Sequence, residues 1–366
     1  MELKKEGKVN RMNRENKYKK RKSQFELLRI IAMFLIVLSH ANIHGVLENG
    51  NSTLLKYPFS TAVSLLMVNG VIGVYIFVLI TGYFMINSKI SYQKIIKLWL
   101  PIVFWSLILY LTFNWRQIQV IPLIKSIFPV IFNQYWFMTV YFLMYCLIPI
   151  LNKVVVTCIT SRNKYYFLIL GEMLILTSCP WIFGKPGIAG SNLINFCVVY
   201  CFGGVIGKTN ILQNENIKKR LLIIFDFSVI FTVFIIPFLV LMAFKLNKLF
   251  LLKIAKLIVI PTFSWLAIII ALGIFIKFAQ MKINFNFFIN KIASLTLGIY
   301  LISDNNYVRS WIWIKIFNLN SIILQSPIIL VGKVLLIAIV VFGVSALLEY
   351  VRQTIFNLLT SKIIFS

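Results

Sequence analysis

Residues 25–44 read FELLRIIAMFLIVLSHANIH, an apolar stretch long enough to cross a bilayer as one helix. Comparable apolar runs recur to the end of the chain, separated by charged residues or by Pro, Gly and Asn. We expect spanning helices near Phe25–His44, Thr61–Ile86, Ile95–Asn114, Asn133–Leu151, Tyr165–Phe183, Asn192–Gly207, Leu221–Phe244, Ile254–Ile276, Ile292–Ile312 and Ile328–Tyr350. The sequence therefore predicts an all-α polytopic membrane protein, a bundle of about ten transmembrane helices.

The composition agrees with a membrane protein. Of the 366 residues, 60% are hydrophobic and 13% are charged, and the mean hydropathy is +0.89. Ordinary soluble domains are about 45–50% apolar and about 25% charged, so a soluble core cannot hide this much apolar surface. These values exclude a water-soluble enzyme, a disulfide-stapled secreted module and a disordered chain.

The charge is distributed unevenly along the chain. The formal net charge of +27 arises from 37 Lys and Arg against 10 Asp and Glu, and many of the cations lie in a basic tail, residues 1–24. A basic tail before a membrane span is typical of a cytoplasmic terminus, so we expect the lipid bilayer as its partner and no nucleic acid. Alternation from there predicts a transmembrane domain, residues 25–350, and a short cytoplasmic tail, residues 351–366. The segment from Lys245 to Lys256 does not fit this topology, because it is basic on the non-cytoplasmic side, where few cations are expected.

Ionisable residues inside the spans are costly and are therefore candidates for function. Arg29 and His40 share the first span, eleven positions apart, which places them on one helix face about 16 Å from each other. The arginine can bind phosphate, and the imidazole can accept a proton near neutral pH. Their spacing suits a long donor such as coenzyme A, although a snorkelling arginine and a packing histidine explain the pair equally well.

Two further groups of residues have a functional and a structural interpretation. His40 and His44 are spaced to share a metal with Glu48, but Glu48 falls in an Asn/Gly-rich loop, so we predict no metal site. Lys94 and Lys97 lie on one helix face at the expected cytoplasmic surface, where they bind nucleotide phosphates or anchor the helix.

The order of several motifs resembles the acyltransferase-3 family of integral-membrane O-acyltransferases of bacterial surface polysaccharides. The resemblance runs from about Gln24 to Tyr350. Its motifs are Arg29 with His40, Gly73-Val-Tyr-Ile-Phe77 with Gly82-Tyr-Phe84, Lys94 and Lys97 before Pro101, Tyr135-Trp136-Phe137 with Tyr141, Tyr145, Pro149 and Asn152, and Gly298-Ile-Tyr-Leu-Ile302. The chain departs from the family where it has Lys94 and Lys97 instead of arginines, Thr81 instead of serine, and Ser303-Asp304 instead of a common histidine.

This resemblance implies about ten helices, acetyl-CoA as the cytoplasmic donor, and His40 as the essential catalytic residue with Arg29 as its basic partner. Lys94 and Lys97 are then the donor-binding residues, and Glu172, Trp136 and Asp304 are candidate supporting residues. No tightly bound cofactor is expected, because acetyl-CoA acts as a co-substrate.

We therefore expect acyl transfer to a hydroxyl of a cell-surface polysaccharide or its lipid-linked precursor, at a bacterial plasma membrane. The first alternative is a flippase that moves a lipid-linked glycan without chemistry. A polysaccharide polymerase is a weaker alternative, because the external segments are short.

Overall fold

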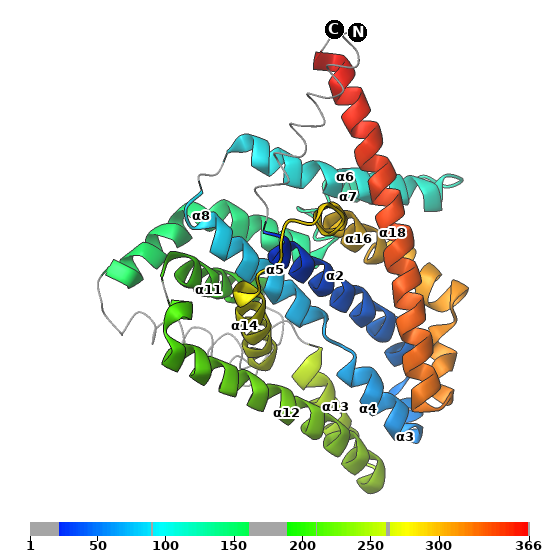
Figure 1. Ribbon diagram of the computed structural model, residues 1–366. Helices are drawn as coiled ribbons and strands as arrows, with labels where there is room; N and C mark the ends of the chain where they lie inside the picture. The colour runs from blue at the N-terminus through cyan, green and yellow to red at the C-terminus, as the bar shows by residue number, and fades with distance from the viewer. Residues whose placement is uncertain (1–21, 89–90, 161–188, 210, 261–263, 365–366) are drawn as a thin grey trace.

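The computed structural model describes residues 22–88, 91–160, 189–209, 211–260 and 264–364, which form helices and their connections without a strand (Figure 1). The α-helices are α2 (Ser23–Ile43), α3 (Asn51–Lys56), α4 (Pro58–Leu66), α5 (Gly70–Met85), α6 (Tyr92–Asn114), α7 (Val120–Ile127), α8 (Trp136–Thr160), α11 (Ala189–Lys208), α12 (Glu215–Leu246), α13 (Leu249–Val259), α14 (Trp265–Gln280), α15 (Phe287–Ala293), α16 (Thr296–Ser303), α17 (Asn306–Ser310) and α18 (Pro327–Ile364). Short 3-10 turns are η1 (Val46–Glu48), η2 (Ile211–Gln213) and η4 (Leu319–Leu324), and η3 (Trp311–Ile316) is π-helical.

The structure confirms an all-α membrane protein but not ten spans. Among the described residues, 6 helical segments are long and apolar enough to cross a membrane, or 7 if one bent pair counts as a span. The predicted span Tyr165–Phe183 lies outside the described residues. α11 and α14 are apolar but shorter than the others.

Three predicted spans differ from the helices that form. The single span Ile254–Ile276 is wrong, because α13 ends at Val259 and α14 begins at Trp265, where the Ser264 side chain accepts a hydrogen bond from the Ala267 N–H. The span Thr61–Ile86 corresponds to one candidate span, Pro58–Met85, which is built from two helices, α4 and α5. The span Ile292–Ile312 is broken by a 73° bend at Ser303–Asn306.

Helix α5 is the centre of the bundle and packs against α2, α11 and α14. Its glycines allow this close approach, since a Cβ at Gly73 would meet the carbonyl oxygen of Ala32 in α2, and one at Gly82 would meet that of Tyr200 in α11. Small residues at helix interfaces are the usual means of bringing helices together in a membrane. In Figure 1, α2 and α5 lie side by side in the middle, with α18 along one flank.

The bundle has two ends, which we name after the residues of α2. At the Arg29 end, Ser23 accepts a hydrogen bond from the Asn286 N–H and donates one to Asn290, and Gln353 of α18 donates to the carbonyl of Ser294. The His40 end holds the last turn of α2, the bend between α16 and α17, and the first turns of α18. The first turn of α2 and the C-terminal part of α18 therefore lie at the same end.

Replacing Gly73 by alanine should loosen the α2–α5 contact. We expect an overpacking cost of about 1–3 kcal/mol, measured as a lower midpoint of thermal unfolding in detergent. Gly343→Ala is the matched control, because nothing lies within 4 Å of a Cβ built there on α18. Equal midpoints for the two variants would contradict the role given to Gly73.

Candidate active site

The last turns of α2 supply two imidazoles. His40 and His44 are one helical turn apart, and their ring centroids are separated by 5.8 Å. The side chain of His40 is 11% exposed, whereas that of His44 is 26% exposed. The two histidines therefore differ in their access to the outside of the bundle.

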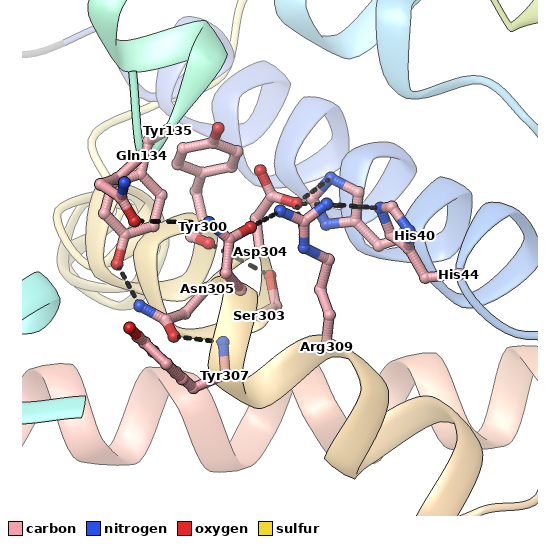
Figure 2. Close-up of polar contacts among 11 residues, drawn as sticks. His40, His44, Gln134, Tyr135, Tyr300, Ser303, Asp304, Asn305, Tyr307 and Arg309 are labelled. Atoms are coloured by element: carbon pink, nitrogen blue, oxygen red, sulfur yellow. Dashed lines mark hydrogen bonds and ion pairs between the residues drawn. The ribbon is translucent and has the colours of Figure 1, made fainter. Parts of the chain in front are cut away.

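The bend between α16 and α17 points a carboxylate at these imidazoles (Figure 2). Asp304 Oδ1 lies 3.5 Å from His40 Nε2 and 3.9 Å from His44 Nε2. Asn305 starts α17 by accepting the Tyr307 N–H at 2.9 Å, so the chain turns immediately after Asp304. The bend that interrupts the predicted span is thus the feature that brings Asp304 into the bundle.

Arg309 of α17 completes the charged group at the His40 end. Its Nε lies 3.7 Å from Asp304 Oδ1 and its Nη1 lies 3.4 Å from His44 Nε2, while it also donates a hydrogen bond to Asn306 (Figure 2). The guanidinium is partly exposed. Asp304 is therefore a counter-ion of Arg309 and a shared neighbour of the two histidines.

A cavity of about 230 Å³ opens beside this group. Its walls include His40, His44, Asp304 and Arg309, together with Trp136 of α8 and Tyr300 of α16. His40 Nδ1 and the Tyr300 hydroxyl are buried and make no hydrogen bond of normal geometry among the described residues, and the neighbour of the Tyr300 hydroxyl is Asp304. Buried polar atoms normally have partners, so these two atoms are available to a molecule in the cavity.

Aromatic residues at and just before the start of α8 pack against Tyr300 of α16. Tyr300 packs at 5.3 Å from the ring of Phe137 and 6.1 Å from that of Tyr135, whose hydroxyl accepts a hydrogen bond from Asn305 at 2.7 Å. Gln134 also contacts Asn306. The start of α8 and the bend after α16 are thus fastened to each other at the cavity.

A buried carboxylate of α18 holds the other end of α16. Glu349 is 1% exposed and accepts two hydrogen bonds from Arg352, one from the indole N–H of Trp105 and one from Gln353, at 2.6–2.9 Å. A Cβ at Gly298 of α16 would collide with this carboxylate. We call Glu349, Arg352, Trp105 and Gln353 the α18 clamp, and it fixes the helix that carries Tyr300 and Asp304.

The predicted donor residues lie at the opposite end. Arg29 forms a 2.7 Å ion pair with Glu26, so it does not contact His40 three turns away. Lys94 and Lys97 are on the exposed first turns of α6. Between the two ends, the Tyr141 hydroxyl shares a 2.8 Å hydrogen bond with Thr81.

The other predicted site residues can now be placed. The structure brings Asp304 and Trp136 to the cavity of His40, whereas Glu172 lies outside the described residues. No group of three or more His, Cys, Asp or Glu in the described part of the chain is arranged to hold a metal ion. Sequence reasoning assigned no role to Tyr300, Arg309 or the α18 clamp, although the i, i+3 spacing of Glu349 and Arg352 is a recognisable signal for an ion pair.

Comparison with known proteins points to one reaction class. A family model described as an acyltransferase domain matches residues 22–350. No curated protein and no solved structure matches the chain. The matched region includes both ends of α2, the cavity, and Trp105 and Glu349 of the α18 clamp.

Glu349→Ala should destabilise the fold, because it leaves Arg352 buried without its counter-ion. We expect a loss of about 3–5 kcal/mol, seen as a lower thermal-unfolding midpoint in detergent, with partial recovery when Arg352→Ala is added. Glu215→Ala removes an exposed carboxylate and is the matched control. The clamp has no supporting role if Glu349→Ala unfolds at the same temperature as the wild type and the Glu215→Ala control.

Proposed function

The chain belongs to the acyltransferase-3 family, and we propose that it transfers an acetyl group from acetyl-CoA to a hydroxyl of a cell-surface polysaccharide or of its lipid-linked precursor. The observation that carries this proposal is the cavity in which His40 Nδ1 and the Tyr300 hydroxyl are buried without hydrogen bonds of normal geometry beside Asp304. A base, a hydrogen-bond donor and space for a reacting carbonyl are the parts that acyl transfer needs.

His40 is the general base of the proposed reaction. Its Nε2 faces Asp304, which leaves Nδ1 to remove the proton from the acceptor hydroxyl. The hydroxyl oxygen then attacks the thioester carbonyl carbon, and a C–O bond forms. The negative charge of Asp304 stabilises the imidazolium that results.

Tyr300 stabilises the tetrahedral intermediate. Its hydroxyl lines the same cavity, and its ring centroid lies 6.1 Å from that of His40. We infer that it donates a hydrogen bond to the oxyanion that forms on the former carbonyl oxygen. The C–S bond then breaks, and the thiolate of coenzyme A takes the proton from His40. An acetyl group carried first on His40 itself is a second route that uses the same residues.

The donor enters from the Arg29 end. Arg29, Lys94 and Lys97 supply positive charge for the phosphates of coenzyme A, and the pantetheine arm extends along α2 toward His40. Tyr141 and Thr81 offer hydroxyl groups along this path. With the Arg29 end in the cytoplasm of a bacterium, the acetyl group reaches the acceptor at the opposite face of the plasma membrane.

His40→Gln should abolish acetyl transfer while the protein still inserts into the membrane. Removal of a general base costs about 10²–10⁴-fold in rate, measured as release of free coenzyme A by purified protein with extracted surface glycan. His44→Gln is the matched control, one turn away on the same helix, and we expect it to keep most of the rate.

Two results would decide against this proposal. Equal activity of wild type and His40→Gln would remove His40 from the chemistry. Absence of thioester consumption by the wild-type protein, with glycan transport intact, would instead favour the flippase.

A further inference from the structure

The carboxylates of the described chain are concentrated at the Arg29 end. Glu26, Glu215, Asp226 and Glu349 lie toward this end, and each is paired with an arginine or a lysine. The His40 end has Asp304, which is buried in the site, and Glu48 among the described residues. Cations at the Arg29 end are therefore partly neutralised by the protein itself, whereas among the described cations at the His40 end Arg309 alone is paired with a carboxylate.

Exposed cations surround the His40 end. We call them the basic collar: Lys56, Arg116, Lys125, Lys245, Lys248, Lys253 and Lys315. Within the described residues, no carboxylate lies within ion-pair distance of these side chains. An uncompensated charge of one sign repels itself and attracts molecules of the opposite sign.

Part of the basic collar lies on the helix that leads to the cavity of His40. Helix α13 carries Lys253, and Ile260 directly after this helix lines the cavity. Lys256 of the same helix donates a 2.9 Å hydrogen bond to Asn51, the first residue of α3, and this bond joins α13 to the helix that follows α2. A polymer that follows the collar along α13 is thereby directed to the reacting groups.

Arg309 provides an anion-binding group inside the cavity itself. Arg352 is an example of an arginine that is fully paired with a carboxylate, since it donates two hydrogen bonds of 2.6 and 2.8 Å to Glu349. Arg309 is held more loosely, since its nearest approach to Asp304 is 3.7 Å through Nε. Its two Nη atoms contact the imidazole of His44 and the amide of Asn306 rather than a carboxylate, so the guanidinium can donate hydrogen bonds to a phosphate or a carboxylate of a bound molecule.

From these observations we infer that the acceptor is an anionic glycan, with phosphate or carboxylate groups along its chain, held by the basic collar and Arg309. This inference rests on the proposed acyl transfer and names its substrate class. It also explains why the Lys245–Lys256 segment is basic at the end of the bundle where a membrane protein of the expected orientation has few cations.

The acceptor class is tested with the full-length protein in phosphatidylcholine nanodiscs and acetyl-CoA labelled in the acetyl group. The probe is surface glycan from cells that lack the gene, separated by anion exchange into retained and unretained fractions. We expect label in the retained, anionic fraction. Label confined to the neutral fraction overturns the inference and leaves the acyl transfer standing, whereas label in neither fraction overturns the proposed function as well.

The basic collar is tested by Lys245→Gln, Lys248→Gln and Lys253→Gln combined. At saturating acetyl-CoA and low salt, we expect KM for the anionic glycan to rise about tenfold, and the difference to shrink in 0.5 M NaCl. Arg309→Gln should also raise this KM. The matched control removes the same charge at the Arg29 end with Lys153→Gln, Lys219→Gln and Arg220→Gln, and we expect its KM to match wild type.

Two outcomes would contradict the role of the basic collar in acceptor binding. An unchanged KM in the collar variant excludes it from acceptor binding. An effect that appears only in nanodiscs containing phosphatidylglycerol shows that the lysines hold anionic lipid headgroups, and this too contradicts the inference.

Discussion

The carboxylate of Asp304 is 3% exposed at one end of an apolar bundle, and a buried charge in such a place requires charged or hydrogen-bonding partners. The last turns of α2 and the first turn of α17 provide these partners as His40, His44 and Arg309. The arrangement holds only if α16 ends before Asp304, if α5 lets α2 approach closely, and if the α18 clamp fixes α16. Much of the architecture thus serves to keep one negative charge beside two imidazoles.

The helical class and many helices can be predicted from the sequence, because an apolar run that is bounded by charged residues and long enough to cross the bilayer indicates a spanning helix. The runs containing α2, α6 and α12 are interpreted correctly in this way. The breaks are harder to predict, since Ile254–Ile276 and Ile292–Ile312 are apolar enough to suggest single spans. In the second, the break depends on Asn305 capping α17 and on the partners that Asp304 finds in another helix, and neither is visible in hydropathy.

The candidate site, like the helix breaks, could be predicted from the sequence only in part. Helical periodicity relates Arg29 to His40 and His40 to His44, because all three lie on one helix. The meeting of α2 with residues some 260 positions later, as in the contact of His44 with Arg309, is a tertiary fact that no spacing rule contains. Ser303-Asp304 differs from the histidine common in the family, yet its carboxylate contacts the histidines that this chain has on α2. Trp136 and Asp304 could be proposed as neighbours of the site from motif order, whereas the two buried atoms on His40 and Tyr300 that make no hydrogen bond of normal geometry required the packed structure.

The charge of +27 also acquires a spatial meaning. At the Arg29 end, the cations fit a donor with phosphates and are accompanied by paired carboxylates. At the His40 end, they stand around the cavity without such partners, which is the pattern expected of a surface that receives an anionic chain. In the reaction that we propose, donor and acceptor approach the same histidine from opposite ends of the bundle.

The most direct test of this account is a double-mutant cycle between His40 and Asp304, with kcat for acetyl transfer as the readout. If Asp304 acts through His40, Asp304→Asn lowers kcat by about 10- to 100-fold in the wild-type background and has little further effect in His40→Gln. Losses that multiply in the double variant would contradict the account, because they would show that the carboxylate and the imidazole act independently.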